Sequence, residues 1–129
     1  MPAEVKYAFF CEDIRQEVAG KITAVGLWGE RCTFLSSPPG TLRNLAFHAH
    51  ILNPESTALR LQLCVHAERA PLDQTVVADV PQGSQQTNLN FITGGVRFEE
   101  PDTVVAELTM GNAAPQTYVL EVGFPEDDA

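Results

Sequence analysis

The stretch "LRLQLCVHAE", residues 59–68, decides the fold, because apolar residues occupy every odd position and mostly polar residues occupy the even ones. A period of two over ten residues is that of a β-strand with one buried face, not that of a helix. Residues 45–51 alternate in the same way, with His48 and His50 on the face opposite the apolar residues. The turn-forming residues 53–56 separate the two runs, so the strands either pair as a hairpin or cross between two sheets.

Strand patterns continue along the whole chain, and turn residues interrupt them every dozen or so positions. The apolar segment 21–28 has the composition of a strand with both faces covered, and Gly94-Gly95 predicts a turn or bulge. No segment of 10 to 15 residues has a helical period. We therefore expect seven to nine strands in a single antiparallel β-sandwich, immunoglobulin-like or C2-like. The further candidate strands are 5–11, 75–80, 87–92, 95–98, 104–110 and 118–122.

The length of 129 residues fits one domain. We assign residues 1–124 to the sandwich and residues 125–129 to an acidic C-terminal tail. The predicted core consists of the inward positions of the alternating strands: Leu45, Phe47, Ile51, Leu59, Leu61, Leu63, Val65, Leu108, Leu120 and Val122.

The formal net charge of −9 disfavours nucleic acid and anionic membrane surfaces as partners, because both carry negative charge. The N-terminus lacks the basic and apolar regions of a signal peptide, and no apolar run approaches the roughly 20 residues of a membrane span. Cys11, Cys32 and Cys64 are odd in number and widely spaced, which argues against a disulfide framework. Together these features predict a cytoplasmic protein.

The segment "EDIRQE", residues 12–17, places Glu12, Asp13, Arg15 and Glu17 between two apolar runs. Residues 11–19 can form a short helix capped by Asp13, or an irregular connection between two strands, and the strand character on both sides favours the connection. Nothing apolar separates the acids, so the sequence gives no reason for the divergent pKa values of a catalytic acid and base. The spacing also lacks the regular oxygen ligands and central glycine of a calcium loop.

Arg15 is expected to order this connection by pairing with one of the neighbouring acids. A rigid guanidinium fork suits burial against the strand that follows. We therefore predict a buried Arg15 whose loss costs roughly 3–5 kcal/mol of stability, rather than the ~0–1 kcal/mol of an exposed ion pair.

The stretch "YAFFCEDIRQEVAGKITAVGLWGE", residues 7–30, resembles the N-terminal signature of a small bacterial β-sandwich family for which no activity is established. In that signature an aromatic-rich strand ends in Cys, an acidic pair, Ile and Arg, followed by an acid, a Gly-Lys turn and a second strand. The resemblance implies a bacterial β-sandwich and says nothing about chemistry. It makes Glu12, Asp13 and Arg15 the leading candidates for a binding role.

Histidine offers a weaker candidate site, because i and i+2 side chains on a strand point the same way and can share a metal. His48 and His50 have this spacing, and His66 lies on the polar face of the next candidate strand. If the two strands paired, Cys64 would lie diagonal to His48. Polar-face histidines are common on solvated sheets, so we expect His48 and His50 to be solvent-facing and metal-free. Trp28, the single tryptophan, is expected in the core, with a ligand platform as the alternative.

No nucleophile elbow, phosphate-binding glycine loop or other catalytic motif is present in the sequence. We expect a non-enzymatic protein-interaction or structural module without a cofactor, whose partner is another protein or a second copy bound through edge strands. A small-ligand or carbohydrate-binding sandwich is the alternative, and would require exposed aromatic residues on one concave face. A metal-dependent enzyme using Glu12, Asp13 and Glu17, or His48 and His50, ranks below both.

Overall fold

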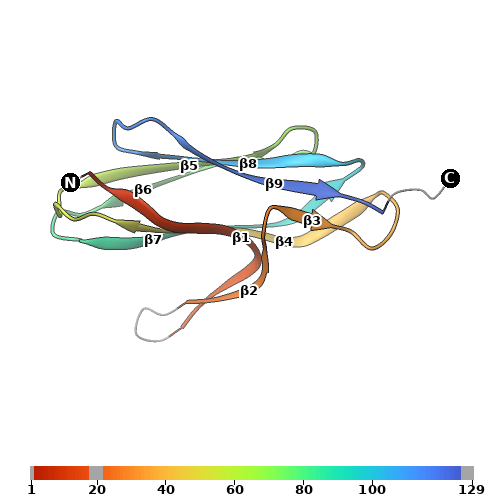
Figure 1. Cartoon of the computed structure of the whole chain (residues 1–129), viewed down its shortest axis with the longest axis horizontal. Helices are drawn as coiled ribbons and strands as arrows, with labels where there is room; N and C mark the ends of the chain where they lie inside the picture. The colour runs from red at the N-terminus through yellow and green to blue at the C-terminus, as the bar shows by residue number, and fades with distance from the viewer. Residues whose placement is uncertain (1, 18–21, 126–129) are drawn as a thin grey trace.

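The computed structural model describes residues 2–17 and 22–125, none of which is helical. Two sheets face each other, so the predicted all-β sandwich is confirmed (Figure 1). The nine strands in this part of the chain are β1 (Glu4–Gln16), β2 (Ile22–Trp28), β3 (Arg31–Thr33), β4 (Gly40–Leu52), β5 (Leu59–Ala67), β6 (Asp73–Val80), β7 (Gln86–Phe98), β8 (Asp102–Met110) and β9 (Gln116–Gly123).

The strand order is β2-β1-β4-β7 in the four-stranded sheet and β3-β9-β8-β5-β6 in the five-stranded sheet. The order β1-β4-β7 opposite β9-β8-β5 is that of strands A-B-E opposite G-F-C in an immunoglobulin-like sandwich. All the described strand pairs are antiparallel except β3 with β9. Of the two predicted outlines, the strand order therefore supports the immunoglobulin-like one.

The core lies between the sheets and is formed by the alternating inward positions of the strands. Residues of β4, β5 and β8 contribute the most deeply buried side chains, including Phe47, Leu63 and Leu108. The ten predicted core residues all belong to or pack against this cluster, with Leu59 at its partly exposed rim. The period-two pattern thus assigned the buried faces correctly.

Two details of the sequence interpretation are resolved by the strand pairing. β4 and β5 do not pair with each other, because residues 53–58 carry the chain from one sheet to the other. β7 runs without interruption through Gly94-Gly95, which forms no turn; Gly95 has a φ of 69°, a conformation that glycine adopts without strain.

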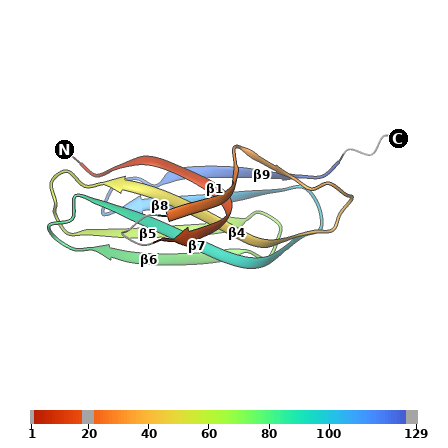
Figure 2. The same ribbon diagram turned by 90° about the horizontal axis from the view of Figure 1, so that it is seen from below.

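β1 and β2 form a hairpin whose far end leaves the two layers of the sandwich (Figures 1 and 2). The first half of β1 pairs with β4 as far as Cys11, and the second half pairs with β2. A small second core anchors the hairpin to the outer face of the four-stranded sheet: Cys11, Ile14 and Ala46, with Phe9, Ile22 and Ala24 packed against them. The expectation that β2 is covered on both faces is wrong, because Thr23 and Leu27 are exposed and Ile22, Ala24 and Trp28 are only half-buried.

Candidate functional site

The charged residues Glu12, Asp13 and Arg15 lie inside β1, opposite β2. The favoured irregular connection is therefore wrong for residues 12–16, and so is a helix that begins at residue 11. Strand pairing with β2 continues to the end of β1, where Asp13 lies opposite Val25 and Arg15 lies opposite Thr23. The last two positions of the segment 11–19 lie outside the described residues.

Arg15 is exposed, and its predicted burial is wrong. The Arg15 side chain is 66% exposed, and its Nε lies 3.8 Å from Oδ2 of Asp13. Glu17, directly after β1, accepts a hydrogen bond of 3.1 Å from the Thr23 hydroxyl. These are surface contacts within the hairpin, because Arg15, Glu17 and Thr23 are all exposed.

Glu12 lies against β2 at Gly26, and the fit between the two is tight. Gly26 has a φ of 65°, and a Cβ atom there would lie 2.7 Å from Cδ of Glu12. The backbone conformation favours glycine at this position, and its missing side chain leaves a space beside β1. The Glu12 side chain occupies that space.

Glu12 also lines a cavity of about 280 Å³, which we refer to as the polar cavity. It lies where the hairpin meets the beginning of β4, and its other lining residues are Trp28, Thr41, Leu42, Arg43 and Asn44. Within the described ranges, no ion pair or hydrogen bond engages the side chains of Glu12, Thr41, Arg43 or Asn44. The cavity thus combines one anion, one cation, an amide and a hydroxyl with an indole.

A second cavity of about 310 Å³ shares Trp28 with the first, and we refer to it as the apolar cavity. It lies between the hairpin and β9, and is lined by Ala8, Phe9, Phe10, Trp28, Gly29, Tyr118 and Val119. Trp28 is half-buried: it packs against the core and also lines both cavities. Each of the two sequence interpretations of Trp28 therefore describes part of its surroundings.

The sequence interpretation singled out Glu12 and Trp28 but missed Thr41, Arg43 and Asn44. The candidate strand began at residue 45, whereas β4 begins at Gly40. The alternation of residues 45–51 did not indicate the missed residues, because buried Leu42 lies three positions before Leu45 and is therefore out of phase with it.

His48 is completely buried, so its predicted exposure is wrong. Its strand neighbour Phe9 covers it, with the ring centroids 5.1 Å apart, and the Tyr7 ring lies 5.7 Å away. His50 is only partly exposed and stacks on Tyr7 at 5.2 Å. The aromatic side chains of β1 lie on the same outer face as these histidines. The sequence of β4 alone could not predict this, because it does not show that β4 pairs with β1.

The two ring nitrogens of His48 differ in their surroundings. Nδ1 lies 2.5 Å from Oδ1 of Asn90, and since an amide oxygen only accepts, Nδ1 carries the proton. Nε2 is buried without a hydrogen-bond partner in the described part of the chain. Burial lowers the pKa of His48 below its ordinary value of 6.5, with an opposing effect of Asn90 and a small further lowering by His50. The folded protein therefore favours neutral His48.

The third histidine is remote from the other two. His66 belongs to β5 of the five-stranded sheet, opposite Asp73 and Val105. The proposed diagonal neighbourhood of His48 and Cys64 does not exist, because their strands belong to different sheets. No group of three or more His, Cys, Asp and Glu side chains suited to a metal ion occurs among residues 2–17 and 22–125.

The cysteines are all free, with Cys11 and Cys32 buried and Cys64 partly exposed. Burial, with the nearby charges of Asp13 and Glu12, raises the pKa of Cys11 to about 11. Burial likewise raises the pKa of Cys32. Both buried thiols are therefore held in the protonated form, which is a poor nucleophile and a poor metal ligand.

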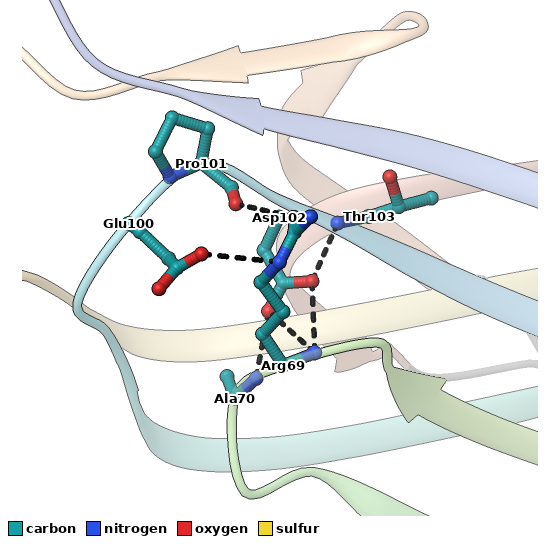
Figure 3. Close-up of polar contacts among 6 residues, drawn as sticks. All are labelled: Arg69, Ala70, Glu100, Pro101, Asp102 and Thr103. Atoms are coloured by element: carbon teal, nitrogen blue, oxygen red, sulfur yellow. Dashed lines mark hydrogen bonds and ion pairs between the residues drawn. The ribbon is translucent and has the colours of Figure 1, made fainter.

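Figure 3 shows a polar network around Asp102 at the beginning of β8. The buried carboxylate accepts hydrogen bonds from the backbone N–H groups of Arg69, Ala70 and Thr103, at 2.7 to 3.3 Å. Arg69 also pairs with Glu100 at 3.1 Å and donates to the Pro101 carbonyl. Backbone donors occupy the Asp102 carboxylate, so it clamps the β5–β6 turn to β8 and is not available to a ligand.

No model of a known protein family matches the chain, and no curated protein matches it. The crystal structure of the apo form of the Calx CBD1 domain is similar, with a TM-score of 0.42 and 12% sequence identity. The match covers 75% of this chain and 92% of that one. No helix in the described ranges is long and apolar enough to cross a membrane.

Proposed function

We propose that this protein is a non-enzymatic interaction module that docks another protein through the free edge of β2. An edge strand presents unpaired backbone donors and acceptors, to which an extended segment of a partner can add as a further strand. The support for β2 comes from a comparison of the edge strands of the two sheets.

The other edge strands carry features that discourage pairing. β3 has three residues, β6 contains Asp73 and Asp79 and is followed by Pro81, and β7 contains Arg97 and the positive-φ Gly95. β2 has seven residues and no charged side chain. Short length, charge, proline and local distortion are the usual protections of an edge, and β2 relies only on the distortion at Gly26.

Exposed apolar side chains reinforce this assignment. Leu27, near the end of β2, is 59% exposed and begins a row that crosses the outer face through Cys11 and Ala46 to Ile92 of β7. Ile92 is 50% exposed, so the row has an accessible apolar residue at each edge of the sheet. We further propose the cytoplasm of a bacterium as the compartment, on the free cysteines and the N-terminal resemblance.

The two ends of this row provide matched variants. We expect Leu27→Lys to abolish capture of the partner protein in affinity purification from a bacterial lysate, because the new charge protects the edge of β2. Ile92→Lys adds the same charge at the opposite edge and should leave capture unchanged. Both substituted side chains are exposed, so thermal melts of the two variants should match that of the original protein.

Other outcomes identify other modes of binding. Loss of capture in both variants would place the partner on the outer face, and loss only in Ile92→Lys would place it on β7; either result refutes docking at β2. The partner at the edge of β2 could also be a second copy of the chain. Light scattering on the purified protein tests this, since such a dimer would dissociate in Leu27→Lys.

A further inference from the structure

Trp28 lies between the polar cavity and the apolar cavity, and protein docking at the edge of β2 assigns no role to either cavity. Trp28 lines the polar cavity and the apolar cavity, so groups bound in the two cavities would contact the same indole. The volumes of about 280 and 310 Å³ lie near the lower limit of small-molecule pockets, roughly 300 Å³. Each cavity is therefore sized for a single small unit of a ligand.

The polar cavity is balanced in charge. Glu12 and Arg43 line it together without forming an ion pair in the described part of the chain. A cationic ligand would be attracted by Glu12 and repelled by Arg43, and an anionic ligand would meet the reverse. The net charge of −9 further disfavours anions. A neutral ligand avoids both penalties.

The polar lining can both donate and accept hydrogen bonds. Arg43 donates, Glu12 accepts, and the side chains of Asn44 and Thr41 do both. Ligand hydroxyl groups also donate and accept, so they match this mixture better than a purely donating or accepting group. The indole of Trp28 adds a flat apolar surface on which the C–H face of a ring can lie.

Glu12 supplies the acceptor of this site from β1. Its side chain is exposed and occupies the space that the missing Cβ of Gly26 leaves. Its carboxylate is therefore available to a ligand in the polar cavity.

We propose that the polar cavity binds one unit of a neutral saccharide and that a second unit extends past Trp28 into the apolar cavity. A saccharide combines the required features: no charge, vicinal hydroxyl groups for Glu12, Arg43 and Asn44, and a C–H face for the indole. This ligand site is separate from protein docking and does not depend on it.

Fluorescence tests the proposal directly, because Trp28 is the only tryptophan in the chain. A glycan array first identifies candidate saccharides. Each candidate is then titrated into the protein, with cellobiose, maltose and diacetylchitobiose as reference disaccharides. We expect a saturable change in Trp28 emission with at least one of these saccharides. The disaccharide of the preferred type should bind more tightly than its monosaccharide. Arg43→Ala and Glu12→Gln should each weaken binding by about tenfold or more, which corresponds to the loss of one charge-assisted hydrogen bond.

Matched controls distinguish this site from general effects. Arg60→Ala removes another exposed arginine, on β5 of the other sheet, and should leave the affinity unchanged. Leu27→Lys should abolish protein docking and leave saccharide affinity unchanged. The docking proposal and the saccharide proposal can therefore fail independently of each other. An array without hits, or binding that Arg43→Ala and Glu12→Gln leave intact, overturns the saccharide site.

Discussion

Three polar or charged side chains are buried in the described part of the chain: His48, Asn53 and Asp102. Their hydrogen bonds give Asn53 and Asp102 a structural role but leave His48 incompletely bonded. Asn53 donates to the carbonyls of Thr57 and Ser84, and Asp102 accepts from backbone amides. Both therefore fix loops. His48 retains a buried nitrogen without a partner, which is a cost that the surrounding rings must offset.

Asp102 should contribute far more to stability than Arg15, although both take part in charged contacts. Asp102→Ala leaves three backbone N–H groups without their acceptor, so we expect the free energy of unfolding to fall by roughly 2–4 kcal/mol. Arg15→Ala removes only an exposed pair and should cost about 0–1 kcal/mol. Urea unfolding of both variants checks this order, and equal losses would show that the Asp102 network is not a clamp.

His48 should make the folded protein sensitive to mild acid. Its pKa is lowered in the folded state by burial, so the unfolded chain binds the proton more readily and stability falls as pH drops below about 6.5. Above the ordinary pKa of 6.5 the residue is mostly uncharged in both states, so this loss is small. Urea melts between pH 7.5 and 5.5 should show a shallower dependence for His48→Gln than for the original protein.

The comparison for this measurement is His66→Gln, which removes a histidine from the opposite sheet and so shows whether the change is specific to His48. A slope that survives His48→Gln would assign the acid sensitivity to other groups.

At the scale of elements, the strands with a strict period of two were predictable and the hairpin was not. Buried positions alternate with half-buried or exposed ones in β5 and with half-buried ones in β8, so their buried faces could be assigned directly. β2 is apolar in sequence but lies at an edge, because its position depends on β1 extending beyond its pairing with β4. Composition cannot show where a strand stops pairing with one neighbour and starts with another.

Two leucines on different elements test this distinction. Leu61 of β5 is almost completely buried, so Leu61→Ala should lower the free energy of unfolding by roughly 2–5 kcal/mol. Leu27→Ala makes the same chemical change at an exposed position of β2 and should cost less than about 0.5 kcal/mol. A loss of under half a kcal/mol for Leu61→Ala, measured in urea, would contradict the assigned face of β5.

At the scale of the whole molecule, the sandwich followed from the sequence but its candidate sites followed only from its topology. Glu12 and Arg43 are thirty-one positions apart and meet at one cavity because β1 lies beside β4. The burial of His48 has the same origin, since Phe9 of β1 covers it. Alternation along one strand predicts which side chains share a face, but not which strand lies next to it.

The strand order also has a consequence for the speed of folding. β4 pairs with β1 and β7 but with neither of the strands that flank it in the chain, so Phe10 must meet Phe47 and Ala46 must meet Ile92 before the four-stranded sheet exists. Closing such long loops is entropically costly, and sandwiches of this kind reach the native state in roughly milliseconds to seconds rather than microseconds. The β1–β2, β5–β6 and β8–β9 pairs are local, so these hairpins can form early, and the docking of β4 between β1 and β7 sets the pace.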